Sequence, residues 1–338
     1  MSKKSEQERG VTVGRAGITS KELARLCGVS QGTVDRALNN RAGISEKTRK
    51  RVLDAAREHG YVKNRHASAL SSGKSGLIGV VMLHLKNEFF SHMLTAIERQ
   101  ARAAGYSVVI MLSNGSEEEE RACIRRLCGM QAAGILLCPV SRDGSWLGSC
   151  PCPIVTLANR VGGNGTTSDL PFVGIDDRRA MYDAARYAIT RGYESLLYYS
   201  PVLALEGGEN IDAQKRRHQG FLEAVRECNT EGVTVADKDL ARVGRFCWEV
   251  RRRGAILCGS DYYALQCMDI VQPTQTGLMG FDQIPALRYV RPALTTVGYP
   301  VEQAGRTATD LLVRLADGGK WDGREVILPH TIVQGKTL

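Results

Sequence analysis

The sequence predicts an α/β protein, in which a small all-α head precedes a larger body made of two lobes with parallel sheets. Two observations predict this division. Residues 1–75 contain 16 Lys and Arg against 7 Asp and Glu, a net charge of +9 that equals the charge of the whole 338-residue chain. The remaining 263 residues are neutral and alternate short apolar runs with amphipathic stretches. A basic segment before a neutral body is typical of a DNA-binding head joined to a domain with another task.

Three helices are predicted in the head, the first two joined as a helix-turn-helix. Thr19 and Glu22 fit a capping box, in which a hydroxyl and a glutamate each satisfy a free backbone donor. Gly28 breaks the first helix and permits a tight turn before Ser30, which can cap the second. Ser45 can cap a third helix. The side chains expected to face the core of the head are Leu23, Ala24, Leu26, Val34, Ala37, Leu38, Val52, Leu53 and Ala56.

The second helix carries the candidate base contacts. Gln31, Gly32 and Arg36 lie near its exposed N-terminal end, from which side chains reach base edges in the major groove. Arg36 could bind guanine through two hydrogen bonds, and Gln31 could bind adenine. Alternatively, Arg36 is solvated or contacts a phosphate. A separate alternative for the whole head is a generic three-helix bundle with no role at DNA. Further candidate DNA contacts are Thr33 and the residues suited to binding phosphates, Thr19, Ser30, Asn39 and Thr48.

Several stretches of this segment carry a resemblance: Gly28-Val-Ser-Gln-Gly-Thr-Val-Asp-Arg-Ala-Leu-Asn-Asn40, Ile44-Ser-Glu-Lys-Thr-Arg49, Gly60-Tyr61 and Asn64-x-x-Ala67-x-x-Leu70. They closely resemble the head and hinge of the LacI/GalR family of bacterial transcription regulators. The resemblance implies that Asn64, Ala67 and Leu70 belong to a hinge that becomes helical when two subunits dock on operator DNA. Leu70 would then wedge into the minor groove. The chain departs from the family at Lys63, where proline is usual, and at Ser68, where Arg or Gln is frequent.

The body alternates predicted strands and helices, which is typical of parallel sheets covered on both faces. Its length suits two similar lobes. No apolar run approaches the roughly 20 residues that span a bilayer, and the first residues lack the apolar core of a signal peptide, so a cytosolic protein is expected. The predicted strands are 77–84, 107–112, 134–138, 154–157, 172–175, 195–199, 255–258 and 277–280, and the helices 91–104, 117–129, 178–191, 213–227, 261–270 and 300–317.

The body also resembles the effector domain of the same family, which is similar to periplasmic sugar-binding proteins and has two Rossmann-like lobes. The resemblance implies a head at 1–62, a hinge helix and linker at 63–75, a first lobe from 76–159 and 297–318, and a second from 160–296 and 319–338. The chain is shorter than usual between Phe221 and Gly280. The matching stretches are 78–81, 87–90, 174–176, 217–221, 260–261, 280–282, 294–297 and 328–338.

Ligands of such folds bind between the lobes, near the carboxyl ends of strands, and the residue types there suit a polyol. Asp261 can accept hydrogen bonds from paired hydroxyls, and Arg217 can donate several. Phe89 and Phe90 offer flat faces to a sugar ring, although both could belong to the core. Asp282 could equally be a structural residue at a strand end. Further candidates at segments near the cleft are Asp143, Asn159, Arg160 and Asp176.

Other chemical signals are weak. Cys150-Pro-Cys152 and Cys123-x4-Cys128 lack the paired spacing of zinc sites, so reduced thiols and no metal or cofactor are expected. No Gly-x-Ser-x-Gly motif is present, which argues against an α/β-hydrolase enzyme.

The resulting hypothesis is a homodimeric transcription regulator, most often a repressor in the family it resembles. Its partners would be a pseudo-palindromic operator in double-stranded DNA and a small effector, expected to be a carbohydrate. Two alternatives remain open at this point. A sugar-binding module would bind a ligand without operator specificity, and a nonspecific DNA-binding protein would show strong salt dependence without a preferred sequence.

Overall fold

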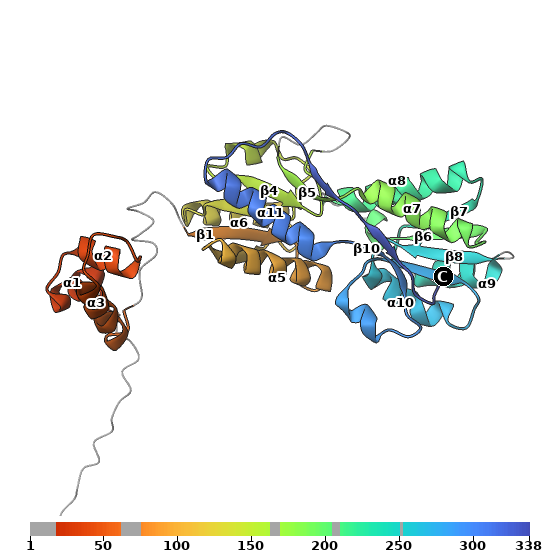
Figure 1. Ribbon diagram of the computed structural model, residues 1–338. Coiled ribbons are helices and arrows are strands. Elements are labelled where there is room, and N and C mark those ends of the chain that lie inside the picture. Colours follow the sequence, from red (N-terminus) through yellow and green to blue (C-terminus); the bar gives the residue numbers. More distant parts are fainter. Residues whose placement is uncertain (1–17, 62–75, 163–169, 205–209, 251–252) are drawn as a thin grey trace, which may run out of the picture. The chain divides into compact units, whose positions relative to one another are not determined.

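The computed structural model describes residues 18–61, 76–162, 170–204, 210–250 and 253–338. The chain divides into two compact units, Met1–Gly73 and Lys74–Leu338, which are the head and the body (Figure 1). The hinge positions predicted from the sequence, Asn64, Ala67 and Leu70, lie outside the described residues. No helix in the described ranges is long and apolar enough to cross a membrane.

The head contains the three expected helices, α1 (Ser20–Cys27), α2 (Gln31–Leu38) and α3 (Glu46–Glu58). The capping box is confirmed, because the Thr19 hydroxyl accepts a hydrogen bond from the Glu22 N–H at 3.2 Å and the Glu22 carboxylate accepts one from the Thr19 N–H at 2.7 Å. Gly28 ends α1 with a φ of 57°, a left-handed conformation that glycine adopts without steric cost. Ser30 and Ser45 cap α2 and α3 through their hydroxyls.

The prediction is wrong for one core residue of the head. Leu26 is 54% exposed, and Cys27 is buried instead. Positions 23, 24 and 27 share one face of a helix with 3.6 residues per turn, whereas position 26 lies off that face. Leu38 and Leu53 are only partly buried. The fully buried positions of the head are Leu23, Ala24, Cys27, Val34, Ala37, Val52 and Ala56.

The body contains two six-stranded sheets, in which all neighbours pair in parallel except β10 with β12. The first sheet has the order β11-β5-β4-β3-β1-β2, with β1 at Leu77–Met82, β2 at Ser107–Leu112, β3 at Gly134–Leu137, β4 at Ile154–Leu157, β5 at Phe172–Ile175 and β11 at Val326–Leu328. The second has the order β12-β10-β9-β8-β6-β7, with β6 at Ser195–Tyr199, β7 at Glu231–Val235, β8 at Gly254–Cys258, β9 at Gly277–Asp282, β10 at Thr295–Gly298 and β12 at Thr331–Val333.

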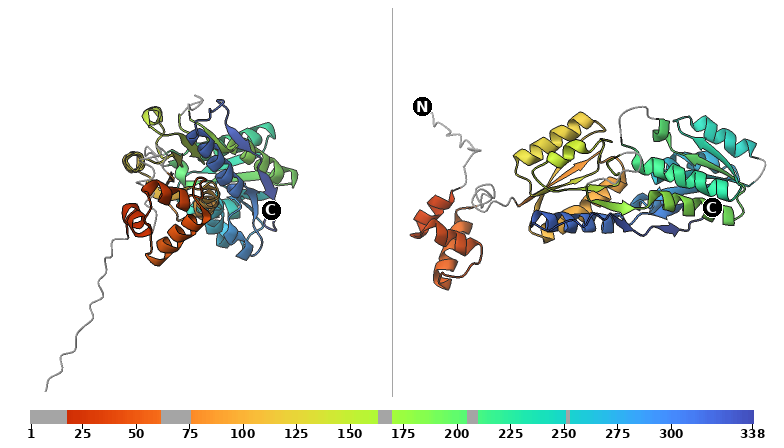
Figure 2. Two further views of the ribbon diagram at one scale, coloured as in Figure 1. Left: turned by 60° about the vertical axis from the view of Figure 1, so that its left-hand side comes forward. Right: turned by 90° about the horizontal axis from the view of Figure 1, so that it is seen from above.

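Helices cover both faces of each sheet (Figure 2). In the first lobe α5 (Glu88–Ala103) and α11 (Val301–Ala316) pack together on one face, and α6 (Glu117–Gly129) covers the other. In the second lobe α7 (Asp177–Thr190) and α8 (Asp212–Glu227) share one face, and α9 (Leu240–Glu249) and α10 (Asp261–Val271) the other. Short 3-10 helices lie at η1 (Ser145–Ser149), η2 (Pro201–Ala204) and η3 (Pro285–Tyr289).

Each predicted strand and helix of the body is present, with ends that differ by three residues at most. In the described part of the body, five further strands and α-helices were not expected, namely β7, α9, β10, β11 and β12, nor were the three 3-10 helices. Exposure explains part of this, because the outer strands β7 and β12 contain exposed positions and therefore show no continuous apolar run.

The lobe boundaries differ from those inferred from the sequence. We expected the first crossing after residue 159, but Thr156 and Leu157 of β4 pair with Phe172 and Val173, so β5 still belongs to the first sheet. Residues 319–338 were expected in the second lobe, yet β11 pairs with β5 and only β12 joins the second sheet. The chain thus crosses between the lobes after β5, after β10 and between β11 and β12.

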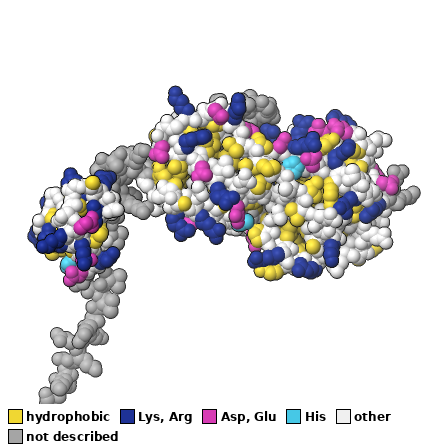
Figure 3. Space-filling model, in the orientation of Figure 1, with side chains coloured by type: hydrophobic (Ala, Val, Ile, Leu, Met, Phe, Trp, Pro, Cys, Tyr) yellow, Lys and Arg dark blue, Asp and Glu magenta, His cyan; other side chains and the backbone are white. Residues whose placement is uncertain are grey.

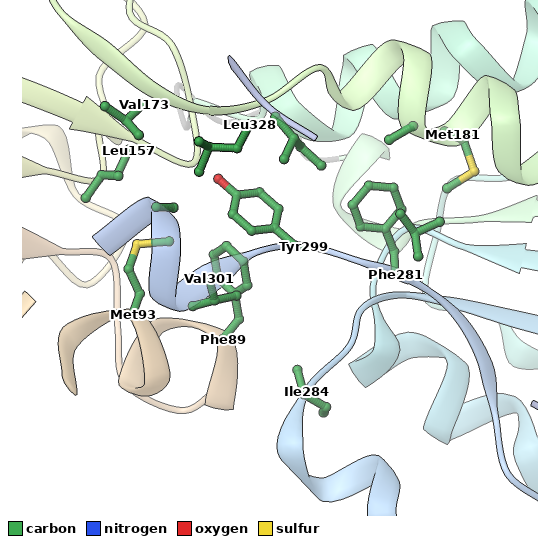
Figure 4. Packing of buried hydrophobic residues seen from close by; sticks show 14 of the residues in the cluster. Phe89, Met93, Leu157, Val173, Met181, Phe281, Ile284, Tyr299, Val301 and Leu328 are labelled. Carbon is green, nitrogen blue, oxygen red and sulfur yellow. The ribbon is translucent and has the colours of Figure 1, made fainter. Parts of the chain in front are cut away.

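A single apolar core runs through both lobes, on the side formed by α5 and α11 in the first and by α7 and α8 in the second. Figure 4 shows Phe89 packed against Tyr299, which lies on the crossing segment between β10 and α11, with Phe281 farther toward the second lobe. The rings of Phe89 and Tyr299 lie edge to face, with centroids 4.9 Å apart. Burying such side chains stabilises the body by about 1.5–3 kcal/mol each.

Substitution of Gly220 by alanine should destabilise the body. A Cβ at this position of α8 would collide with the backbone carbonyl oxygen of Arg178 in α7, and backbone cannot yield as a flexible side chain can. We expect a loss of about 1–3 kcal/mol in the free energy of unfolding measured with urea. Gly244→Ala in α9 is the control, since its Cβ would touch only Ile270 at 3.8 Å. This control should gain up to about 1 kcal/mol. Equal effects of the two substitutions would contradict the close approach of α7 and α8.

Candidate nucleic-acid interface and interlobe cavity

The second helix of the head exposes the three candidate base contacts, Gln31, Gly32 and Arg36. The only acidic residue of α2 is Asp35, and its two carboxylate oxygens are taken up by other residues. One oxygen accepts a hydrogen bond from Asn39 at 2.6 Å, and the other pairs with Arg41 at 3.1 Å. Arg36 is exposed, but it lies in the last turn of α2 and not near the N-terminal end of the helix as expected.

The candidate phosphate contacts lie mostly at helix N-termini. The hydroxyls of Thr19 and Ser30 cap α1 and α2, and the hydroxyls of Thr33 and Thr48 lie 3.0 and 2.9 Å from the capping serine of their own helix. Helix N-termini attract anions, so these positions are compatible with phosphate binding. Asn39 differs, since its amide donates to Asp35. Lys and Arg side chains spread over the drawn face of the head (Figure 3).

A cavity of about 370 Å³ opens in the body between the two lobes. Its walls come from the segments that follow the carboxyl ends of strands in both sheets, which is where α/β folds bind ligands. The volume lies in the range of small-molecule sites. The lining residues are Leu83, His84, Lys86, Asn87, Phe89, Phe90, Asn114, Gly115, Cys138, Pro139, Val140, Ala158, Asn159, Val202, Asn210, Ile211, Ala213, Gln214, Arg217, Ser260, Tyr263, Asp282 and Tyr299.

Five of the nine candidates for effector contact line this cavity: Phe89, Phe90, Asn159, Arg217 and Asp282. The two phenylalanines lie edge to face with centroids 5.3 Å apart. Phe89 is 6% exposed and belongs to the core, whereas Phe90 is half-buried and lies at the border between the core and the cavity.

Arg217 is the centre of a buried ionic network in the cavity wall. Its Nε donates to Asp177 at 2.8 Å, and its Nη1 donates to the carbonyl of Gly259 at 2.6 Å and lies 3.4 Å from Asp282. The guanidinium also stacks over Phe281 at 3.6 Å. Burial alone would lower the pKa of Arg217, but the neighbouring carboxylates raise it, so the cation is fixed. Burial raises the pKa of Asp177 and of Asp282 despite this cation.

Two asparagines join the lobes beside the cavity. Asn159 follows β4, and its Oδ1 accepts a hydrogen bond from the Ala213 N–H at 3.0 Å, so the first lobe caps the N-terminus of α8 in the second. The Asn159 Nδ2 donates to the carbonyl of Asn210 at 3.0 Å. Asn210 in turn donates to the carbonyls of Arg160 and Ser141 at 2.6 and 3.2 Å. A ligand in the cavity would therefore lie against the contacts that set the arrangement of the lobes.

Four candidates do not line the cavity. Asp143 is exposed and accepts hydrogen bonds from Ser145 at the start of η1, and the exposed Asp176 caps α7. Arg160 is buried, with its Nε 2.9 Å from Glu325 and its guanidinium over Phe172. Asp143 thus forms a local turn and Asp176 a helix cap, whereas Arg160 also lies 3.8 Å from Asp212 at the start of α8 in the second lobe.

Asp261 is the fourth and is fully buried at the start of α10. Its carboxylate accepts hydrogen bonds from the Thr296 hydroxyl at 2.5 Å and the Ile284 N–H at 2.8 Å, and thereby ties β10 and the segment after β9 to α10. Burial raises its pKa to about 7, although the hydrogen bonds and the charge of Arg217 act in the opposite direction.

Several polar lining residues were missed in the sequence. Gln214 lies three residues before Arg217, and this spacing on one helix face could have revealed it. Tyr263 follows Asp261 in the first turn of α10, which is a weaker signal. Lys86 and Asn210 lie outside the helices and strands and carry no pattern of their own.

Comparison with protein families identifies three matching segments. Residues 19–64 match the family described as bacterial regulatory proteins, lacI family. Residues 75–244 match the periplasmic binding proteins and sugar binding domain of the LacI family, and residues 185–338 match a periplasmic binding protein-like domain.

Whole-chain relatives give the same result. The HTH-type transcriptional regulator GalR of Escherichia coli (strain K12) is 30% identical over 320 residues, covering 88% of this chain and 89% of GalR. Catabolite control protein A of Priestia megaterium is 27% identical over 332 residues, covering 93% and 97%. Among solved structures, the Lac repressor dimer bound to operator and the anti-inducer ONPF has a TM-score of 0.81 at 21% identity, covering 95% of this chain and 98% of that one. At this identity the last comparison shows the fold.

Substitution of Asp261 by asparagine should flatten the dependence of stability on pH. A carboxyl group with a raised pKa contributes stability below its unfolded-state pKa near 4 and loses it as pH rises through about 7. Between these two pKa values, the free energy of unfolding of the wild type should fall by up to about 1.4 kcal/mol per pH unit because of this group. The Asp261→Asn variant should lack this decrease.

Urea unfolding at several pH values between 5 and 8 measures this slope. Asp143→Asn is the control, because Asp143 is exposed and hydrogen bonds from Ser145 lower its pKa, so it titrates below this range. If the free energy of unfolding has the same slope against pH in the wild type and in Asp261→Asn, the protonation of Asp261 does not contribute to the pH dependence of stability.

Proposed function

The chain belongs to the lacI family of bacterial regulatory proteins, and we propose that it is a transcription repressor whose affinity for a specific operator is controlled by a small molecule bound between the lobes of its body. One observation carries this proposal. The same chain joins a head that exposes Gln31 and Arg36 on its second helix to a body with a polar cavity at the carboxyl ends of both sheets. The protein would act in the cytoplasm by binding rather than by turnover.

In this proposal α2 enters the major groove of the operator. Gln31 and Arg36 contact bases, and residues at the helix N-termini, such as Thr19 and Ser30, contact phosphates. Two chains form a homodimer, so that two heads bind a pseudo-palindromic site. The Lac repressor structure with operator, which has the same fold as this chain, is of a dimer.

The proposed effector is a carbohydrate. The cavity provides a fixed cation at Arg217, a carboxyl group at Asp282 and aromatic faces at Phe90 and Tyr263. Such a combination suits a molecule with many hydroxyls on one side and C–H groups on the other. The family description that matches most of the body also names a sugar binding domain.

Coupling between effector and operator would arise from movement of one lobe relative to the other. The cavity is lined by both lobes, and Asn159 joins them through the N-terminus of α8. A ligand that fits one arrangement better shifts the population toward it, and only this difference in affinity can couple the two sites.

The first experiment is the selection of random double-stranded DNA by the full-length protein at near-physiological salt. Recovery of a pseudo-palindrome is expected and provides the operator for the following measurements. If correctly folded protein recovers no common sequence, it is not a specific regulator.

Arg36→Ala should weaken binding to the selected operator by about 1–3 kcal/mol, because a bidentate contact to one base is lost. Fluorescence anisotropy with the operator and with a scrambled duplex measures both affinities. Arg57→Ala removes an exposed arginine of α3 and serves as the control. A loss for Arg36→Ala that is equal on both duplexes would mean that Arg36 contacts phosphate only.

Phe90→Ala should raise the carbohydrate concentration needed to change operator affinity by about 3- to 10-fold, since a ring face in the cavity is removed. The measurement is a titration of the operator complex with sugars, after a screen for those that raise the melting temperature. Trp248→Ala, which removes an aromatic side chain that is 71% exposed, should leave the titration unchanged. An unchanged titration for Phe90→Ala would remove this residue from the effector site.

A further inference from the structure

Three cysteines from two separate segments meet in the first lobe. Cys128 lies near the end of α6, and Cys150 and Cys152 lie between η1 and β4. The Sγ atoms of Cys128 and Cys150 are 3.3 Å apart, those of Cys150 and Cys152 are 3.7 Å apart, and all three lie within 4.8 Å of one another. All three are free thiols and partly buried, so they are shielded but still reachable.

This cluster is separate from the interlobe cavity. It lies at the edge of the first sheet at which β1, β3 and β4 begin, whereas the cavity lies at their carboxyl ends. The three cysteines pack against the apolar cluster beneath α6, as do Leu77, Trp146 and Leu170. None of the three cysteines lines the cavity or has a part in the proposed regulator function.

The three sulfur atoms lie close enough together to bind one metal ion after small shifts that widen the shortest distance. Thiolates bound to a metal at about 2.3 Å stand about 4 Å from one another. Thiolate ligands select soft ions such as Cu(I), together with zinc. Structural zinc sites are almost always four-coordinate. Within the described part of the chain, no histidine or carboxylate joins the three sulfurs. The donor set therefore favours an ion that binds three ligands, as Cu(I) does, over zinc.

The backbone that carries Cys150 and Cys152 is restrained by its own sequence and by a hydrogen bond to β3. Pro151 and Pro153 alternate with Cys150 and Cys152, and each proline ring fixes its own φ. The carbonyl of Pro153 accepts a hydrogen bond from the Ile135 N–H at 2.9 Å, which attaches this segment to the start of β3. Ligands on a fixed backbone lose little freedom when an ion binds.

We propose that Cys128, Cys150 and Cys152 form a three-thiolate site for Cu(I) in the first lobe of the body. Each thiol releases its proton to solvent as its sulfur binds the ion, and no electron is transferred. The bound ion joins the end of α6 to the segment before β4, at the edge of the lobe where β1 enters from the linker.

The test is an anaerobic titration of the reduced, full-length protein with Cu(I) in competition with a coloured Cu(I) chelator. We expect the protein to retain one Cu(I) ion per chain in the presence of the chelator. X-ray absorption at the copper edge should show three sulfur neighbours around that ion. Cys128→Ser and, separately, Cys152→Ser should each weaken Cu(I) binding by at least about 100-fold, which is the upper end of the effect of losing a supporting contact. Circular dichroism checks that each variant is folded.

Cys228→Ser is the matched control, because Cys228 is also a partly buried free thiol but lies at the end of α8 in the second lobe. It should bind Cu(I) as the wild type does. The proposal is overturned if the reduced wild type yields its copper to the chelator, if Cys228→Ser weakens binding as much as Cys128→Ser, or if the three cysteines retain Zn²⁺ but not Cu(I).

Discussion

The buried guanidinium of Arg217 is the interaction on which the second lobe and the cavity wall both depend. It joins α8 to the first turn of α7 through Asp177, to the end of β8 through Gly259 and to the end of β9 through Asp282. Removing one partner of a buried ion pair leaves an uncompensated charge, at a cost of about 3–5 kcal/mol. The network is therefore a structural support of the lobe as well as a polar surface for a ligand. The carboxylates of Asp177 and Asp282 hold Arg217 in its charged form.

Local signals made most of the fold predictable. The capping box at Thr19 and the turn at Gly28 depend only on neighbouring residues, and the buried strands are continuous apolar runs. Leu26 was expected in the core as part of a short apolar stripe, but its angular position on α1 lies off the buried face, which Cys27 completes. The outer strands and the lobe crossings depend on pairing between distant segments, such as β5 with β11, and no local pattern encodes that pairing.

The cavity was predictable where candidates follow strand ends, as do Phe90 and Asn159. Aspartates were less predictable, because a short carboxylate after a strand is equally suited to capping the next turn, as Asp143 and Asp176 do. Asn210 was missed since its role is to connect the lobes, which requires knowing where Ser141 and Arg160 lie. The cysteine cluster was missed for the same reason, because its members are brought together only by the packing of α6 on the sheet.

The last two strands have a consequence for biosynthesis. β11 supplies an outer strand of the first sheet and β12 an outer strand of the second, and they are separated by only Pro329 and His330. Domains of a nascent chain generally fold as units from the N-terminus. The head can therefore fold early on the ribosome, whereas neither sheet can be completed until β11 and β12 have emerged. A truncated translation product would carry a folded head on an unfinished body.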